Sequence, residues 1–259
     1  EDSLWNAVPK ICSRLSQAVE QYSGKELPIN YSPFKFGSWM GGDRDGNPNV
    51  NHKTTQEVIL LSRWEAANLY EKEFTKIIQH LSLYECSNEI KKVVGKSQEP
   101  YRAYLRPIRN KLKSTQKEIE NYLIKNKTLD NKLLVNSIHE IIDPLLVVYN
   151  SLCKARSKSI ADGYILDLLR RANSFGINLA KVDIRQEASR HTRLVSKIYN
   201  NLNKKKFFNL KEEEKILFLI KSLKSKKSLI NKKTFSNRED KETWETFKLL
   251  ARTPKECLG

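Results

Sequence analysis

Cysteine and histidine are scarce in this sequence, and neither residue is clustered. Its four cysteines and four histidines are scattered along 259 residues, and none pairs with another at the spacing of metal ligands or of a CxxC motif. Zinc sites and catalytic dithiols need such spacings. The sequence therefore gives no sign of such a site, and its free thiols indicate a reducing compartment.

Long apolar runs are also missing. No stretch approaches the roughly 20 apolar residues of a membrane span, and the opening "EDSLWNAVPK" lacks the apolar core of a secretory signal. We therefore expect a cytoplasmic protein with no membrane partner. Because no initiator methionine is present, we also expect a piece of a larger chain.

Acidic residues are outnumbered, which gives a formal net charge of +17. Such a charge suits a polyanion, so a basic helical module that binds nucleic acid is an alternative function. Residues 221–233, "KSLKSKKSLINKK", contain six lysines but no acid and no aromatic residue for base stacking. We favour a solvated surface there, and nucleic acid is not the expected partner.

Apolar residues at three- and four-residue steps predict a mainly α fold with more than half of its residues in helices. Thr54 or Thr55 is a candidate cap for one helix, Pro144 a candidate start or kink in another, and Gly176 a candidate C-cap. We expect one fragment over 1–259, with a Lys-rich helical part at 200–259. Strand candidates lie near 35–40 and 178–184; helices are expected near 3–22, 54–83, 100–125, 130–155, 161–175, 189–201, 210–224 and 239–251.

Each strand candidate ends in a charged segment, and barrel enzymes carry their chemistry in loops at the carboxyl ends of parallel strands. In "DIRQEASRHT", Arg185 offers a planar fork that binds carboxylate or phosphate. The alternative is an internal ion-pair network that ties Arg185 to Asp183 or Glu187.

The other segment, "FGSWMGGDRDGNPNV", spans residues 36–50. Trp39 offers a flat apolar wall, and Gly41 and Gly42 allow a sharp turn or a close approach to a ligand. It lacks the Gly-Lys-Ser ending of a phosphate-binding loop. On chemistry alone, a site loop and an elaborate structural turn stay equally open.

These two segments resemble signature segments of phosphoenolpyruvate carboxylase. "LLSRWEAANLY", "YRAYLRPIRNKL" and "ADGYILDLLRRANSFG" resemble segments of the same family in the same order. The chain is thus identified as an internal piece of such an enzyme. The resemblance implies a mostly helical protein around an eight-stranded parallel barrel, of which this piece supplies the first two strands.

The resemblance also implies a carbon–carbon lyase reaction that forms oxaloacetate and phosphate from phosphoenolpyruvate and bicarbonate, with Mg²⁺ or Mn²⁺. Phosphate passes first to bicarbonate, which gives carboxyphosphate and an enolate; the enolate then attacks the released CO₂. The parent enzyme is expected to be a homotetramer.

By the same resemblance, Arg185 is a catalytic and substrate-binding residue on the phosphate side of the reaction. Trp39 is a substrate-binding residue near the methylene end of the substrate and CO₂. Six residues are expected to shape the site loop: Gly41, Gly42, Asp43, Arg44, Asp45 and Asn47. Four more are expected to orient Arg185: Asp183, Glu187, Arg190 and His191.

Several family segments are missing from this sequence. It has no Thr-Ala-His-Pro-Thr-Glu stretch with the catalytic histidine, no metal carboxylates of the family pattern, no Ser-Asp-Ser-Ala-Lys segment and no Gly-Arg-Gly-Gly loop. We therefore expect the chain by itself to be inactive and to bind no metal.

Overall fold

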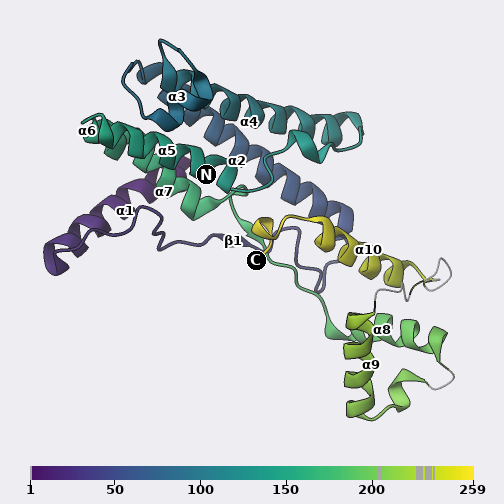
Figure 1. The fold of residues 1–259 in the computed structure, drawn as a ribbon. Helices are drawn as coiled ribbons and strands as arrows, with labels where there is room; N and C mark the ends of the chain where they lie inside the picture. Colours follow the sequence, from purple (N-terminus) through teal and green to yellow (C-terminus); the bar gives the residue numbers. More distant parts are fainter. Residues whose placement is uncertain (1, 204–205, 226–229, 231–234, 236) are drawn as a thin grey trace. The chain divides into compact units, whose positions relative to one another are not determined.

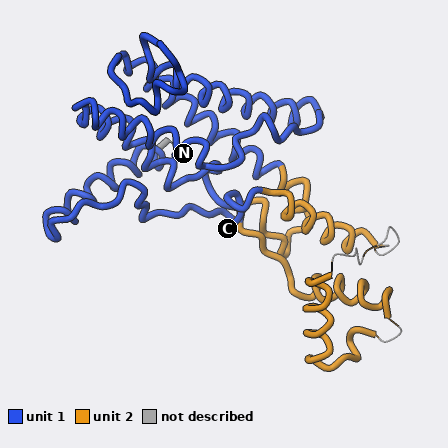
Figure 2. The backbone as a smooth tube through the Cα atoms, viewed as in Figure 1, with its two compact units in different colours: residues 1–38, 57–182, 254–259 blue, residues 39–56, 183–253 orange. Residues whose placement is uncertain are grey.

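The computed structural model describes residues 2–203, 206–225, 230, 235 and 237–259 (Figure 1). Helices hold 69% of these residues, which confirms the prediction of a mainly α fold. Most of the lysine run at 221–233 lies outside the described residues. The chain divides into two compact units (Figure 2). Unit 1 contains residues 1–38, 57–182 and 254–259, and unit 2 contains residues 39–56 and 183–253.

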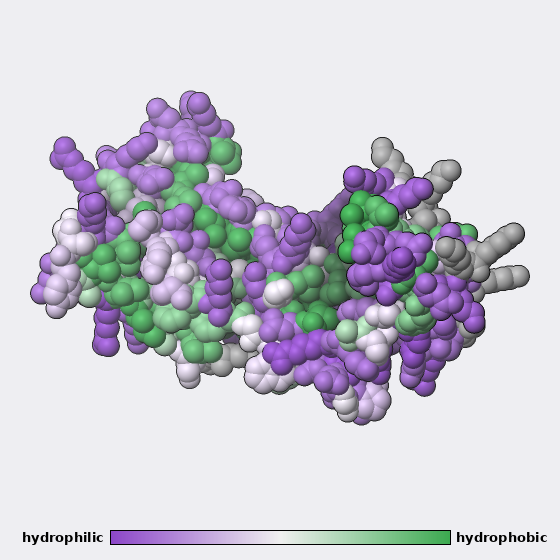
Figure 3. Space-filling model, turned by 90° about the horizontal axis from the view of Figure 1, so that it is seen from below, coloured by the Kyte–Doolittle hydropathy of each residue, from purple (hydrophilic) through white to green (hydrophobic). Residues whose placement is uncertain are grey.

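Unit 1 is a helical bundle whose core lies between long amphipathic helices. On one of them Leu105, Leu112 and Ile119 recur every seven residues on one face, and each is at most 1% exposed. Figure 3 shows apolar side chains recessed between projecting polar ones. The helices are α1 (Asp2–Ser23), α2 (His52–His80, whose first five residues belong to unit 2), α3 (Asn88–Val94), α4 (Pro100–Lys125), α5 (His139–Lys154), α6 (Lys158–Ile160) and α7 (Leu166–Phe175), with short 3₁₀ helices at Asn131–Leu133 and Lys255–Cys257 and a π-helical segment at Ala161–Ile165.

Unit 1 also contains a parallel pair of two-residue strands, β1 (Gly37–Ser38) and β2 (Lys181–Val182). Gly37 lies opposite Lys181 and Ser38 opposite Val182, so both strand candidates are confirmed. Both strands are shorter than predicted. Asn178 is fully buried, and its Nδ2 donates to the carbonyl of Ala180 at 2.7 Å, which holds a bend directly before β2.

Two local predictions in this part of the chain were wrong. Asn51 caps α2 in place of Thr54 or Thr55, because its Oδ1 accepts from the backbone N–H groups of Lys53 and Thr54. Helix α5 begins at His139 and continues through Pro144, so Pro144 does not start a helix, while a kink there stays a prediction. Gly176 does follow the last residue of α7 with φ of 68°, as a glycine C-cap requires.

Unit 2 contains α8 (Ala188–Leu202), α9 (Glu212–Lys224), α10 (Arg238–Arg252) and a short turn at Phe207–Asn209, which confirms the three helices predicted there. Asp240 at the start of α10 is 1% exposed, and its carboxylate binds Arg193 and Lys197 of α8. This buried clamp joins the two helices. In the described part of the chain, no helix is long and apolar enough to cross a membrane.

Candidate functional site

The two charged segments meet in unit 2 although they lie far apart in the sequence. Trp39 follows β1 directly and Asp183 follows β2 directly. Beyond the strands, the backbone N–H of Arg44 donates to the Arg185 carbonyl, and the backbone N–H of Arg185 donates to the Gly42 carbonyl, both at 3.0 Å. These bonds form a parallel bridge that holds the two segments in register.

The side chains of Arg185 and Trp39 lie against each other. The Arg185 Cζ is 5.5 Å from the centroid of the Trp39 ring, within the range of a cation–π contact. Both side chains are exposed, Trp39 by 61%. Among the described residues, no ion pair joins Arg185 to Asp183 or Glu187. The guanidinium fork therefore remains open to an external anion.

Arg44 is a buried arginine inside the loop, with 4% of its surface exposed. Its Nη1 donates to the Gly42 carbonyl at 2.9 Å, and its Nη2 donates to Thr55 Oγ1 at 2.6 Å. Burial lowers the pKa of Arg44, and the charge of Glu242 opposes this shift. Thr55 is fully buried, and its Oγ1 also lies 2.7 Å from the Gly41 carbonyl oxygen. The sequence suggested only a helix cap for Thr55, since its partner lies fourteen residues earlier.

The first turn of the loop depends on its glycines. Gly41 has φ of 71°, a conformation that residues with a Cβ rarely adopt. The Trp39 carbonyl accepts from the N–H groups of Gly42 at 2.9 Å and Asp43 at 3.0 Å. This tight turn brings the Gly42 carbonyl back toward Arg185.

The second half of the loop is shaped by short polar side chains. Asp43 Oδ1 accepts from the N–H of Asp45, and Asn47 Oδ1 accepts from the N–H of Asn49, both at 3.1 Å. These bonds mimic backbone turns. Asp45 and Asn47 are exposed. Their contribution to a functional site stays a prediction.

Two of the four residues expected to orient Arg185 make contacts elsewhere. Glu187 Oε1 accepts from Ser189 Oγ at 2.7 Å, and the His191 ring lies 5.3 Å from the Phe247 ring. In the described structure, no hydrogen bond or ion pair connects their side chains to that of Arg185. Their role as its partners stays a prediction for the whole set: Asp183, Glu187, Arg190 and His191.

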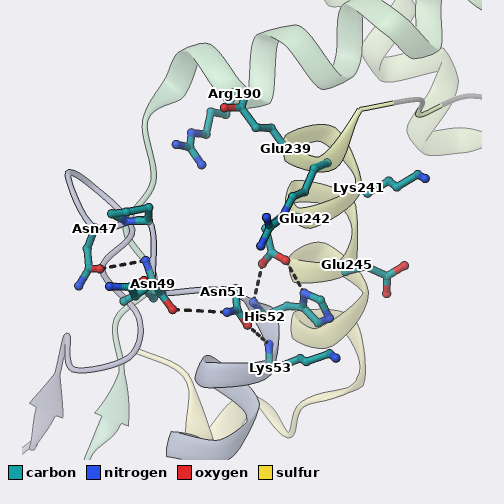
Figure 4. Close-up of a pocket in the computed structure, with 13 residues that line it drawn as sticks. Asn47, Asn49, Asn51, His52, Lys53, Arg190, Glu239, Lys241, Glu242 and Glu245 are labelled. Atoms are coloured by element: carbon teal, nitrogen blue, oxygen red, sulfur yellow. Dashed lines mark hydrogen bonds and ion pairs between the residues drawn. The ribbon is translucent and has the colours of Figure 1, made fainter.

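An open pocket of about 970 Å³ lies beside the loop in unit 2 (Figure 4). Residues 47–53 form one wall, α10 forms the other, and Arg190 projects from the start of α8 above them. Glu242 joins the walls, since its oxygens accept from the backbone N–H of His52 and approach His52 Nδ1, each at 2.5 Å. Arg185 and Trp39 do not line this pocket.

Among the described residues, the carboxylates that line this pocket have partners, whereas the lining lysines and arginines have no ion-pair partner. Each of the pocket's three glutamates has a partner. Glu242 contacts His52, and Glu239 and Glu245 form ion pairs with cations that do not line the pocket. Within the described ranges, no lining lysine or arginine has an ion-pair partner. The pocket therefore favours anionic groups over cationic ones. The unmatched cations are Lys53, Arg190, Arg238 and Lys241.

The residues that the structure describes give no indication of a metal centre. Among them, no group of three or more His, Cys, Asp and Glu side chains lies close enough together to hold a metal ion. These residues therefore do not fit a resident divalent ion, and no chemical step of this site is assigned to one.

The sequence of this chain is similar to one family along its whole length. A profile of the phosphoenolpyruvate carboxylase family matches residues 1–259. Phosphoenolpyruvate carboxylases of Acinetobacter baylyi and Vibrio vulnificus are both 40% identical over the whole of this chain, and that of Psychromonas ingrahamii is 42% identical. The chain spans 30% of the length of each of these relatives. It therefore belongs to the phosphoenolpyruvate carboxylase family.

Proposed function

We propose that this chain is part of an enzyme that forms oxaloacetate and phosphate from phosphoenolpyruvate and bicarbonate. The single observation that carries the proposal is the environment of Arg185. Its exposed guanidinium lies over Trp39 in the signature loop and, within the described residues, has no carboxylate partner. Because no carboxylate of the described residues takes up the donors of this exposed arginine, its N–H fork stays available to a substrate anion.

Arg185 binds the phosphate group of phosphoenolpyruvate in this proposal. A guanidinium presents parallel N–H donors that match two phosphate oxygens, and it stays charged throughout catalysis. As phosphate moves to bicarbonate, negative charge redistributes over the transferred oxygens, and a fixed cation stabilises that charge. The products of this step are carboxyphosphate and the enolate of pyruvate.

Trp39 provides the apolar part of the site. Carboxyphosphate releases CO₂ and phosphate, and the enolate carbon then attacks CO₂ to form oxaloacetate. Water competes by protonating the enolate, so an apolar wall near the methylene carbon protects it. The aromatic face of Trp39 suits this task and simultaneously holds Arg185 by the cation–π contact.

The rest of the active site is proposed to come from parts of the parent protein outside this chain. A divalent cation, when bound, would supply a Lewis acid for the enolate oxygen. We propose that its carboxylates and the catalytic histidine belong to those other parts, so that the isolated chain is inactive. We also propose that the parent assembles as a homotetramer. The unmatched cations around the pocket of unit 2 support attraction of anionic substrates.

The test is bicarbonate-dependent oxaloacetate formation by the complete protein with Mg²⁺, compared between wild type and Arg185→Ala. We expect kcat/KM to fall about 10²–10³-fold in Arg185→Ala, as when a donor to transition-state charge is removed. Arg252→Ala is the matched control, because Arg252 is an exposed arginine of α10 outside the pocket, and its activity should stay unchanged. Full activity of Arg185→Ala would mean that Arg185 has only a structural role. No activity in a folded wild-type protein would refute the proposed function.

A further inference from the structure

We propose that Thr55 and Arg44 are positioning residues that fix the backbone of Arg185 through the carbonyl group of Gly42. This inference rests on the proposed function, because it assigns these residues a role through Arg185. Neither side chain needs to touch the substrate.

The Gly42 carbonyl links the Arg44 side chain to the backbone of Arg185. It accepts one hydrogen bond from the backbone N–H of Arg185 at 3.0 Å and another from Arg44 Nη1 at 2.9 Å. The backbone N–H of Arg44 donates in turn to the Arg185 carbonyl at 3.0 Å. One residue, Arg44, therefore restrains Arg185 on both of its backbone polar groups.

Thr55 determines where the Arg44 guanidinium lies. Its Oγ1 accepts from Arg44 Nη2 at 2.6 Å, so its single hydroxyl proton is left for a carbonyl. The Gly41 carbonyl at 2.7 Å and the Asn51 carbonyl at 3.1 Å are the available acceptors, and the shorter distance favours Gly41. Thr55 thus connects the first turn of α2 to the tight turn of the loop.

Burial makes these contacts hard to replace. Thr55 is 0% exposed and Arg44 is 4% exposed, so water has little access to substitute for a missing hydroxyl. Removal of the Thr55 hydroxyl frees Arg44 Nη2, and the released guanidinium no longer holds the Gly42 carbonyl in place. A shift of about 1 Å in a group that binds the reacting centre can cost about a hundredfold in rate.

The first test measures geometry and does not depend on turnover. Hydrogen exchange of the Arg185 backbone amide is followed by mass spectrometry in the complete protein, for wild type, Thr55→Val and Thr55→Ser. Valine keeps the shape but lacks the hydroxyl, and serine keeps the hydroxyl. We expect Thr55→Val to lose protection at Arg185 by about tenfold or more and Thr55→Ser to retain it. Unchanged protection of α8 amides serves as the check that unit 2 is folded.

The second test measures the consequence for the reaction. We expect Thr55→Val to lower kcat/KM for phosphoenolpyruvate about ten- to a hundredfold, while Thr55→Ser restores it. In an Arg185→Ala background, Thr55→Val should have little further effect, because the group that it positions is gone. Arg44→Lys should behave like Thr55→Val, because lysine cannot hold the carbonyl and the hydroxyl with a planar fork.

Three outcomes would overturn the proposal. They are unchanged protection of the Arg185 amide in Thr55→Val, unchanged kcat/KM despite lost protection, and an equal loss of activity with and without Arg185. An inactive wild-type protein would instead refute the proposed function, and the exchange comparison would still decide whether Thr55 holds the Arg185 backbone.

Discussion

Replacing Asp240 by asparagine should loosen unit 2 more than any exposed charge change on the same helix. The Asp240 side chain is 1% exposed, receives Arg193 Nε at 2.9 Å and binds Lys197 Nζ. Asparagine keeps the size and one acceptor but loses the charge, while both cations remain. Hydrogen bonds to charged groups contribute about 1.5–3 kcal/mol each. Because the amide retains part of one bond, we expect a loss of about 3 kcal/mol.

Native-state hydrogen exchange of α10 amides measures this loss within unit 2. A change of about 3 kcal/mol corresponds to exchange roughly a hundredfold faster at 25 °C. The matched control is Glu239→Gln, which removes a neighbouring carboxylate that binds the same arginine at 2.5 Å but is 57% exposed. An exposed pair contributes less than about 1 kcal/mol, so its effect should be under fivefold. Equal acceleration in Asp240→Asn and Glu239→Gln would refute the argument from burial.

Two further predictions concern titratable groups of unit 1. Burial alone would raise the pKa of Glu140, but hydrogen bonds from Lys111 and from the backbone of Asn136 outweigh it and lower the pKa below its ordinary 4.5. The carboxylate therefore contributes stability above about pH 4.5, which is lost as pH falls through the lowered value. Glu140→Gln should lower the free energy of unfolding in urea by up to about 1 kcal/mol at pH 7, and the difference should shrink toward pH 3; a constant difference would contradict this. Burial also raises the pKa of Cys257 to about 11, so iodoacetamide at pH 8 should leave it unlabelled in the native protein and label it after denaturation, as mass spectrometry would show.

The features that sequence predicted well depend on neighbouring residues. The apolar repeat of Leu105, Leu112 and Ile119 places one helix face in the core, and Gly176 ends α7, because both signals act within a few turns. The second strand candidate was located by alternating apolar residues, but Asn178 shortens it through a side-chain bond that alternation does not reveal.

The features that sequence missed depend on distant partners. His52 meets Glu242 across 190 residues, and no local pattern indicates that pair. Thr55 looked like a helix cap, since threonine before an apolar run is commonly one, yet Asn51 takes that role and Thr55 binds the loop. Composition gave no reason to pair Trp39 with Arg185; only the family resemblance assigned both to one site.

The contact between Trp39 and Arg185 provides an optical signal at the proposed substrate site. The emission of an exposed indole responds to a nearby charge, and the guanidinium of Arg185 is the charge beside this ring. An anion that drew the guanidinium away would change that emission before any bond is made or broken. The three other tryptophans of this chain are Trp5, Trp64 and Trp244, and they would contribute a background because the Arg185 guanidinium lies over Trp39. Occupancy of the site could therefore be followed separately from catalysis, with no label added to the protein.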